Sequence, residues 1–470
     1  MGHVPVFALA DDLSGAAETA AVLMSPERPA RITLSGPPYV AMPPVLVADL
    51  DTRHRPGAAA LVREALASAG DRHVLIKIDS LLRGDIAATV HACLTTPARS
   101  ASVPVVLACA LPQAGRTVVN GVPLIHGIPL RETRTRPAQP QTPPTTAPTT
   151  GSAAGTAAGS AAGTAAGTTA GTTAGSGVPA TVAETLGGVP SAGVGLDTVR
   201  AGRAALMQAL AKVAASGRVA VCDAETDGDL DTIVAAALVN DPATRLIGAG
   251  GLAAALGRAL NPAPAPAPPG PPPPPADGSS AGVPVTGPTS PQVGGPAALL
   301  VVVGTAEPAA AEQARLLVAH GAEPVTLDAA DLAAVDPGTA AGPRTAAEPV
   351  VGRVRRALAG GVAVLTVRGP APPSLTAILG RTVREALGAT RADLVLTGGE
   401  TARRVLDALD VRELIPVGQV HHGAVHSRTP DGRSVVTRPG SFGGRDSLLR
   451  IAAHLRPGRF PTTTIDERPT

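Results

Sequence analysis

The stretch VPVFALADDLSGA, residues 4–16, joins a short apolar run to a pair of carboxylates and then to a segment of small residues. The run from Val4 to Ala10 is typical of a buried strand, and the residues from Leu13 onward suit a helix. Similar pairs of an apolar strand and a helix recur along the chain. This alternation predicts parallel sheets covered on both faces, in which ligands bind beyond the carboxyl ends of the strands.

The alternation falls into two halves. We therefore predict an α/β protein of two domains with parallel-type sheets covered by helices, and an active site in the interdomain cleft. The strand-like runs are residues 4–10, 45–48, 74–78, 103–108 and 219–222 in the first half, and 299–303, 362–367 and 394–397 in the second. The helical stretches are residues 58–69, 85–94, 199–215 and 230–240, and then 309–320, 349–358, 374–387 and 401–409.

Two low-complexity segments divide the chain. Residues 134–177 consist mainly of Thr, Ala, Gly and Pro, a composition that buries too little apolar area to offset chain entropy. Residues 261–296 contain PAPAPAPPGPPPPP, which favours a semi-rigid polyproline spacer. We expect an N-terminal domain at 1–260 interrupted by the first segment, a linker at 261–296, a C-terminal domain at 297–458 and a tail at 459–470.

The composition argues against several classes of protein. The 470 residues carry a formal net charge of +2 and only 1% aromatic side chains, so a nucleic-acid platform is not expected. No apolar run reaches the ~18 residues that a membrane span needs, and the start of the chain lacks the pattern of a signal peptide. Cys93, Cys109 and Cys222 are widely spaced, which favours reduced, buried thiols. We expect a cytoplasmic protein without nucleic-acid or membrane partners, for which a homo-oligomer stays open.

Charged residues crowd the strand ends of the first half. Asp11 and Asp12, followed by Ser14 at a helix start, suit binding of a hydroxyl group or Mg²⁺, or simple capping of the helix. The next strand is followed by Arg53, and the third ends in KIDSLLRGD, residues 77–85. Burying so many polar groups is costly unless they pair with one another or bind a ligand. Arg and Lys are suited to a carboxylate ligand.

The strand ends of the second half are rich in glycine instead. They carry Gly304-Thr305, TGGET at 397–401 and PGSFGG at 439–444. Glycine lets backbone N–H groups approach a phosphate, and the start of the following helix favours negative charge. A single glycine pair could equally serve a tight turn, but three such loops favour a phosphate site. The two halves together predict phosphoryl transfer to a small, anionic, hydroxylated substrate.

These motifs resemble the four-carbon acid sugar kinases. The resemblance implies an N-terminal domain that binds the sugar acid, a C-terminal domain that binds ATP, a requirement for Mg²⁺, and transfer to the terminal hydroxyl of 3-oxo-tetronate, threonate or erythronate to give a 4-phosphate. The matching stretches are ADDLSGA at 10–16, KIDSLLRG at 77–84, AGRTVVNGVPLIHGIPL at 114–130, DAETDGDL at 223–230, GAGGLAAAL at 248–256, TGGETARRVL at 397–406 and PGSFGGRDSLL at 439–449.

The resemblance points to individual site residues, and we assign roles to them as a hypothesis. Either Asp12 or Asp79 would accept the proton of the attacking hydroxyl, and Lys77 would offset the charge developing on the phosphate. The expected substrate-binding residues are Asp12, Arg53, Ser80, Arg83 and Arg116, of which Arg83 and Arg116 would clamp the carboxylate. The expected nucleotide-binding residues are Thr305, Gly398, Gly399, Glu400, Thr401, Gly440 and Gly443, and no metal ligand is assigned.

The chain departs from the family pattern at Leu81, Ala249, Gln419 and Arg438, where Thr, Ser, Glu and Lys are frequent, and the repeat replaces a family segment after Leu130. A second hypothesis is therefore a catalytically weakened homologue that binds a sugar acid or a nucleotide. A metal-hydrolase interpretation could use His421, His422 and His426. These residues lie near a predicted hairpin without a set of carboxylates, so we expect surface histidines there.

Overall fold

The computed structural model describes residues 4–37, 39, 42–97, 103–133, 178–262, 298–305, 307–329, 348–369, 374–388, 390–440 and 442–460. The Thr/Ala/Gly/Pro segment at 134–177, most of the Pro-rich segment at 261–296 and most of the tail at 459–470 lie outside the described residues.

Strand β1 (Val6–Ala10) lies inside a parallel N-terminal sheet. It pairs on one side with β3 (Val45–Asp49) and on the other with β4 (His73–Lys77), so that Asp49, Ala10 and Lys77 end at the same level. Because the chain runs to one neighbour and then crosses to the other, β1 marks a topological switch point, where α/β sheets bind ligands. The other strands of this sheet are β2 (Ala30–Thr33), β11 (Arg245–Gly248), β5 (Val105–Ala108), β10 (Val219–Cys222) and β9 (Ser191–Val194).

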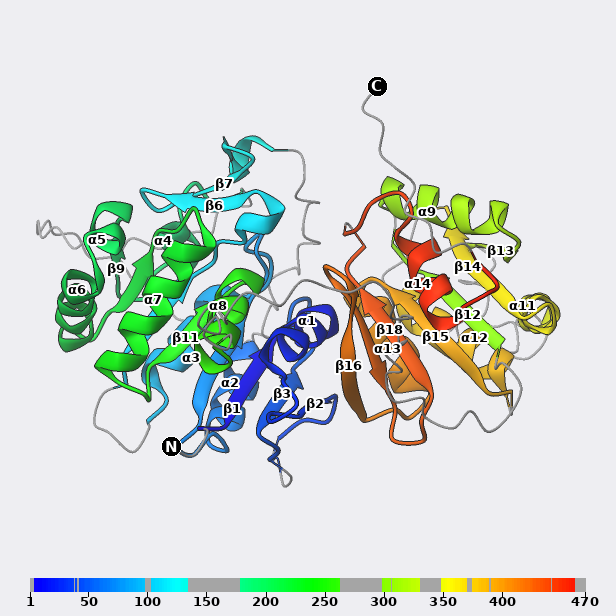
Figure 1. Ribbon diagram of the computed structural model, residues 1–470, viewed down its shortest axis with the longest axis horizontal. Coiled ribbons are helices and arrows are strands. Elements are labelled where there is room, and N and C mark those ends of the chain that lie inside the picture. The colour runs from blue at the N-terminus through cyan, green and yellow to red at the C-terminus, as the bar shows by residue number, and fades with distance from the viewer. Residues whose placement is uncertain are drawn as a thin grey trace, which may run out of the picture.

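Helices flank this sheet, and a small antiparallel sheet lies at its edge (Figure 1). The expected single helix over 199–215 is wrong: α5 (Leu196–Arg200) ends before Gly202, whose φ of 103° only glycine adopts readily, and α6 (Arg203–Ala215) follows. The other helices are α1 (Leu13–Leu23), α2 (Ala58–Leu66), α3 (Ile86–Thr95), α4 (Val182–Leu186), α7 (Asp227–Asn240) and α8 (Gly250–Leu260). The small sheet contains β6 (Arg116–Val119), β7 (Val122–Ile125) and β8 (Ile128–Pro129), with short 3₁₀ helices at Pro112–Ala114 and Leu130–Glu132.

The C-terminal sheet repeats the switch-point arrangement. Strand β12 (Ala298–Val303) lies between β14 (Val362–Arg368) and β15 (Ala392–Thr397), parallel to both. The remaining strands are β13 (Glu323–Asp328), which is parallel to β14, and β18 (Ser434–Arg438), which is parallel to β15. Strand β17 (Ala424–Arg428) is antiparallel to both β18 and β16 (Glu413–His421). The helices are α9 (Pro308–Ala319), α11 (Glu348–Ala359), α12 (Leu375–Leu387), α13 (Gly399–Ala408) and α14 (Ser447–Leu455).

The two sheets join edge to edge. Strand β2 pairs antiparallel with β16, with Ile32 opposite Leu414 and Thr33 opposite Glu413. The pairing makes one continuous sheet that runs through both halves. Helix α1 lies close to this junction in Figure 1 and contacts α13 of the C-terminal half. The α/β class and the helix-covered parallel sheets predicted from the sequence are confirmed.

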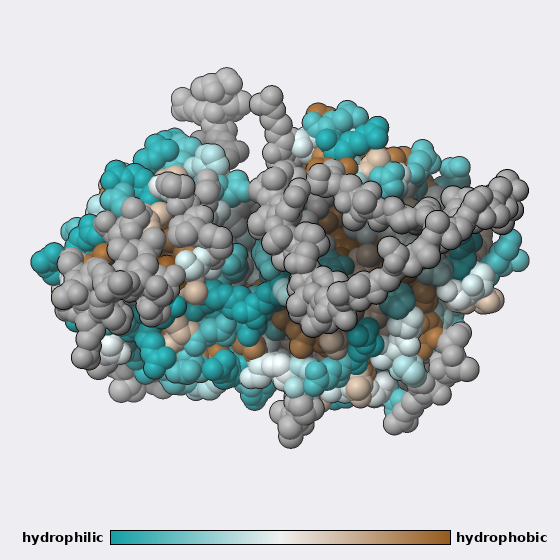
Figure 2. All heavy atoms as spheres, turned by 180° about the vertical axis from the view of Figure 1, so that it is seen from behind, coloured by the Kyte–Doolittle hydropathy of each residue, from teal (hydrophilic) through white to brown (hydrophobic). Residues whose placement is uncertain are grey.

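The core consists mainly of small aliphatic side chains. Helix α1 buries Ala16, Ala17 and Ala20, which lets it approach the sheet closely. On the face turned away in Figure 1, hydrophilic and hydrophobic side chains are interspersed where the surface is described (Figure 2). Among the described residues, no helix has the length and apolar character that crossing a membrane requires.

Candidate active site

The ends of β1 and β4 converge on Arg53, which itself follows β3. Its guanidinium donates from Nε to Oδ2 of Asp11 at 2.8 Å and from Nη1 to Oδ2 of Asp12 at 2.6 Å. It also lies 3.9 Å from Asp79, which follows β4. The side chain of Arg53 is only 11% exposed. One buried cation thus holds together three carboxylates from two different strand ends.

Burial and the arginines act in opposite directions on these carboxylates. Burial raises the pKa of Asp11, although the charge of Arg53 opposes it. Burial would also raise the pKa of Asp79, but the charge of Arg53 and the hydrogen bonds from Arg83 hold that pKa well below its usual range. Arg83 donates two hydrogen bonds to Asp79, from Nε at 2.7 Å and from Nη2 at 2.9 Å. Asp79 is therefore an anion fixed by two guanidinium groups.

Asp12 has a different environment from Asp79. Its Oδ1 accepts the N–H of Gly15 at 2.8 Å and so caps the start of α1. The capping role considered for this motif is thus present. Asp12 also lines the cleft described below, whereas Asp79 is 5% exposed and does not line it. Of the two carboxylates, Asp12 has the better access to a ligand.

Lys77 at the end of β4 faces α1. Its ammonium lies 3.5 Å from Glu18 Oε2 and donates to the carbonyl of Ile78 at 3.3 Å. Glu18 is only 7% exposed and is the only charged residue of helix α1. The sequence interpretation missed Glu18. An acidic residue one helical turn after Ser14, on the same face, was the available signal.

Arg116 connects the N-terminal half to a loop of the C-terminal half. It starts β6 and donates from Nη1 to the hydroxyl of Ser80. Its guanidinium also lies 5.8 Å from the ring centroid of Phe442, within reach of a cation–π contact. Burial lowers the pKa of Arg116. The structure thus brings Ser80, Arg83 and Arg116 to the same side of the N-terminal switch point.

Glycines of the C-terminal half permit very close backbone approaches. A Cβ on Gly399 would collide with Oδ2 of Asp12 and lie 3.0 Å from Oγ of Ser14. Gly398, which precedes it, has a φ of 95°. A Cβ on Gly440 would lie 2.6 Å from Oγ1 of Thr305. The first residue of α13 therefore lies directly against Asp12, which follows β1 of the N-terminal sheet.

Arg438 organises the glycine loop that follows β18. Its side chain is fully buried and donates to the carbonyls of Gly440, at 3.2 Å, and Phe442. It also donates to Gln313, whose amide in turn donates to the carbonyl of Gly443 at 3.1 Å. Burial lowers the pKa of Arg438 to about 10. This buried cation lies directly behind the loop, where its field favours an anion.

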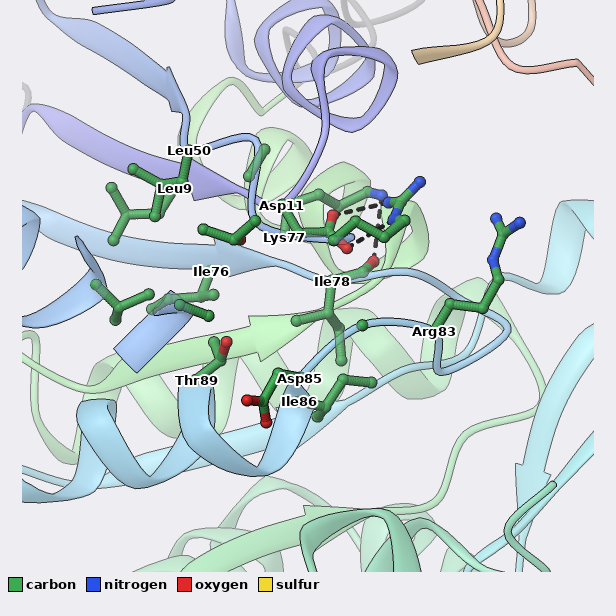
Figure 3. Close-up of a pocket in the computed structure, with 16 residues that line it drawn as sticks. Leu9, Asp11, Leu50, Ile76, Lys77, Ile78, Arg83, Asp85, Ile86 and Thr89 are labelled. Atoms are coloured by element: carbon green, nitrogen blue, oxygen red, sulfur yellow. Dashed lines mark hydrogen bonds and ion pairs between the residues drawn. The ribbon is translucent and has the colours of Figure 1, made fainter. Parts of the chain in front are cut away.

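A cleft of about 530 Å³ lies between the two switch points. A far smaller cavity of about 20 Å³ lies behind it, under Asp11 and Lys77, and is walled by Leu9, Ile76 and other apolar side chains (Figure 3). Figure 3 shows Arg83 extending away from this cavity. The larger cleft is therefore the candidate substrate site. The predicted site residues that line it are Asp12, Arg53, Arg83, Thr305, Gly398, Gly399, Glu400, Thr401 and Gly440.

The remaining predicted site residues lie outside this lining. Lys77 lines only the small cavity. The network described above contains Asp79, which binds Arg83, and Ser80 and Arg116, which bind each other beside it. Gly443 lies deeper in the 439–444 loop, where a Cβ would lie 2.6 Å from Oγ of Ser447. The structure therefore groups these five residues around the cleft rather than in its wall.

A second cavity of about 390 Å³ is also lined by residues of both halves. Glu18, Gly250 and Gln113 line it from the N-terminal half, and Gln419 and His422 from the C-terminal half.

Two of the departures from the family pattern concern this cavity. Gln419 lines it, and Ala249 starts α8 beside it without a side-chain cap. Leu81, by contrast, packs into the hydrophobic core.

The expectation of surface histidines is wrong for His426. His426 is 8% exposed, and its Nδ1 lies 3.0 Å from Nε2 of His454. Burial lowers the pKa of His426 to about 4, so a neutral ring is favoured. His421 is half-buried and binds Ser447 at 2.9 Å. The β16–β17 hairpin folds these rings against α14, which the sequence does not show.

The glycine-rich positions at Gly399 and Gly440, with Thr305, are called here the phosphate cradle, and they fit a nucleotide. A start of α13 that admits no side chain at Gly399, together with Thr305 and Gly440, is the arrangement that brings backbone N–H groups to phosphates. Asp11, Asp12 and Glu400 also line the cleft. Within the described ranges, no group of three or more His, Cys, Asp or Glu could hold a metal ion. The carboxylates of Asp11, Asp12 and Glu400 fit Mg²⁺, which is commonly bound by one or two carboxylates together with substrate phosphates.

The fold is an α/β fold of two halves, and the cleft is lined by charged residues of one half and by glycine-rich strand ends of the other. Comparison with known families agrees: residues 6–149 and 166–256 match the sugar-binding N-terminal domain, and residues 300–448 match the nucleotide-binding C-terminal domain. The chain belongs to the four-carbon acid sugar kinase family that these domains define.

Curated relatives include two D-threonate kinases. The one from Cupriavidus necator is 30% identical over 257 residues, and the one from Salmonella typhimurium LT2 is 30% identical over 259 residues. Each match covers 53% of this chain and 52% of the relative, so the chain spans about half the length of the curated relatives it matches.

Solved structures share the fold. A Salmonella typhimurium LT2 protein reported as a proposed tRNA synthase has a TM-score of 0.64 at 17% identity, covering 97% of this chain and all of that one. A Haemophilus influenzae protein has a TM-score of 0.59 at 16% identity, covering 96% of this chain and all of that one.

Proposed function

We propose that this protein transfers the terminal phosphoryl group of ATP to a hydroxyl of a four-carbon sugar acid. The observation that carries the proposal is the contact between the start of α13 and Asp12, which brings a phosphate cradle against a set of charged strand ends. The D-threonate kinase relatives and the two family domains support the same reaction class. A 3-oxo-tetronate, threonate or erythronate is the proposed acceptor, and a 4-phosphate the proposed product.

The cations around Asp79 would bind the carboxylate of the acid. Arg83 lines the cleft, and its side chain is 29% exposed, so it can contact a ligand while it stays bound to Asp79. Arg116, held by Ser80 and covered by Phe442, lies next to Arg83 in the charge network. Two adjacent guanidinium groups suit a carboxylate better than a neutral sugar. Arg53 would act by fixing Asp11 and Asp12.

Asp12 is the better candidate for the proton acceptor. The pKa of Asp79 is held low by the arginines and its side chain does not line the cleft, so it is a weak base without access to the hydroxyl. The oxygens of Asp12 are also bound, by Arg53 and by the N–H of Gly15, so it is access to the cleft that favours Asp12. Asp12 faces the cleft beside the first residue of α13. We therefore assign Asp12 the role of accepting or orienting the proton of the attacking hydroxyl, and Asp79 the role of positioning Arg83.

Residues of the C-terminal half would hold the nucleotide. Thr305, Gly398 to Thr401 and Gly440 line the cleft and would bind the phosphates, with Gly443 supporting the loop. Asp12 and Glu400 are placed to hold Mg²⁺. When bound, ATP and Mg²⁺ supply the phosphoryl group and neutralise charge on it. Lys77 would offset charge on the phosphate from the acceptor side only in part, because Glu18 beside α1 compensates much of its charge.

A coupled assay of ADP release tests the proposal. The purified chain, with ATP and Mg²⁺, is assayed against 3-oxo-tetronate and the stereoisomers of threonate and erythronate. We expect turnover with one or more of these acids, and a product whose phosphate is on the terminal oxygen by phosphorus NMR. Thermal stabilisation by ATP and an acid without ADP release would instead favour the weakened homologue, for which the uncapped Ala249 is the structural argument.

A further inference from the structure

Helix α13 belongs to the nucleotide-binding half but is anchored to the other half at two points. Its first residue, Gly399, packs directly against Asp12 and Ser14. The next anchor lies one turn further along, at Arg403 and Arg404. Arg403 reaches across the domain boundary to Asp49 at the end of β3, and Arg404 reaches to Asp51 in the loop that follows it.

The contacts of Arg403 and Arg404 are short and largely buried. Arg403 donates from Nη1 to Oδ2 of Asp49 at 2.9 Å and from Nη2 to the carbonyl of Leu34 at 2.7 Å. Arg404 donates from Nη2 to Oδ2 of Asp51 at 2.6 Å. The Asp49 side chain is fully buried, and those of the two arginines are 12% and 15% exposed. Burial of this kind makes the pairs far less screened than surface ion pairs.

The loop after β3 carries the connection back to the acid pair. Oδ1 of Asp49 accepts the N–H of Asp51 at 3.0 Å, and Asp51 has a φ of 51°, a conformation that needs such support. Two residues later Arg53 binds both Asp11 and Asp12. The backbone N–H groups of Thr52 and Arg53 also donate to the carbonyl of Asp11, at 3.0 and 3.1 Å.

These contacts form a closed ring across the domain boundary. From Gly399 the ring runs to Asp12, then to Arg53, back along the 49–53 loop, and through Asp49 and Arg403 into α13 again. We propose that the pair Asp49–Arg403, called here the α13 latch, is a positioning pair for phosphoryl transfer, supported by the neighbouring pair Asp51–Arg404, which lies in the wall of the cleft. The latch sets the separation between the phosphate cradle and the acceptor site without lining the cleft itself.

The reason is geometric. Phosphoryl transfer depends on the attacking and leaving oxygens being in line, and a displacement of ~1 Å can cost about a hundredfold in rate. Without the latch, α13 would still be held to the rest of its own half by α12 and β15. The cradle would therefore survive, but its position over Asp12 would not be fixed.

The first measurement compares activity with binding. Arg403→Ala, Asp49→Asn and the double variant Asp49→Asn/Arg403→Gln, which leaves no unmatched charge, are assayed by ADP release and by titration with a non-hydrolysable ATP analogue. The inference rests on the proposed kinase activity for this readout. We expect kcat to fall about a hundredfold while the affinity for the analogue changes less than about threefold. Arg403→Lys should recover part of kcat.

The second measurement needs no activity and so separates this inference from the proposed function. Spin labels at Arg63→Cys and Arg315→Cys, both exposed, report the distance between the halves, because the native cysteines are buried. The matched control is Arg384→Ala, which removes a 2.8 Å bond to the carbonyl of Ala408 at the far end of α13, within one half. We expect the latch variants to broaden the distance distribution and the control to leave it unchanged.

Three results would overturn the inference. Distance distributions that are identical in wild type and latch variants would show that the latch does not position the halves. A loss of analogue affinity as large as the loss of kcat would place Arg403 in the nucleotide site instead. An equal effect of Arg384→Ala would show a general requirement for α13 stability.

Discussion

The N-terminal and C-terminal switch points have the same topology but different chemistry. At the first, Arg53 neutralises a set of carboxylates through its guanidinium, and recognition would depend on side chains. At the second, Gly399 and Gly440 remove side chains so that the backbone can approach a phosphate. Under the proposed function, this difference means that side chains of one half would select the acid, whereas the backbone of the other half would bind the phosphates.

Each half also contains a buried arginine, and these two differ in the same way. Arg53 binds carboxylates, which hold its pKa above the usual value despite the opposing effect of burial. Arg438 donates to backbone carbonyls and to Gln313, all of them neutral, and burial lowers its pKa. The charge of Arg53 is compensated by carboxylates of the protein, whereas the charge of Arg438, whose partners are neutral, acts on the glycine loop.

The largest expected effect comes from Asp12→Asn. If the N-terminal switch point supplies the proton acceptor, kcat should fall by ~10²–10⁴, since that is the usual contribution of a general base. Asp85→Asn is the matched control, because Asp85 caps α3 through the same kind of bond but is exposed. A kcat for Asp12→Asn within a few-fold of wild type would remove Asp12 from this role.

Asp79→Asn should act mainly on stability. Removing one partner of a buried charge network costs about 3–5 kcal/mol, which urea unfolding at pH 7 would measure. Because the pKa of Asp79 is lowered in the folded state, its contribution is present above the unfolded pKa and is lost as pH falls through the folded one. The stability difference between wild type and variant should therefore shrink below about pH 4. A difference that does not depend on pH would contradict this assignment.

Gly399→Ala tests the backbone side of the comparison. The added Cβ would collide with Asp12, so the start of α13 must shift and kcat should fall about a hundredfold. Gly352→Ala in α11 is the control, since a Cβ there meets nothing within 4 Å. The steady-state kinetics of the two variants should differ sharply. Normal turnover by Gly399→Ala would mean that the cradle does not approach the acid pair during the reaction.

Arg438→Lys should have the smallest effect of the four. The lysine ammonium keeps the positive charge, but it cannot reach all the carbonyls that the arginine guanidinium binds. Leaving a buried carbonyl without a hydrogen bond costs about 1–3 kcal/mol. We expect that loss in thermal or urea unfolding, with affinity for ATP largely kept. Arg438→Met, which removes the charge, should weaken ATP binding further. Equal ATP affinity in the Lys and Met variants would show that the charge does not act on the phosphates.

Local patterns predicted much of the fold and of the site. The apolar run before Asp11 and the glycine pair at 398–399 identify strand ends because both signals lie within a few adjacent residues. The pairing of Asp49 with Arg403 links residues far apart in the sequence and could not be predicted from either motif. A hairpin near His421 was predicted, but its antiparallel pairing with β18 and the break at Gly202 were missed, because their patterns are short and ambiguous.

The division of labour between the halves is the central claim, and a crossed binding experiment tests it most directly. Calorimetry would measure the affinity of Arg83→Met and Gly440→Ala for the preferred four-carbon acid and for a non-hydrolysable ATP analogue. We predict that Arg83→Met weakens binding of the acid by about tenfold or more and leaves the nucleotide unaffected, and that Gly440→Ala does the reverse. Equal losses for both ligands in both variants, or the opposite pattern, would contradict the account.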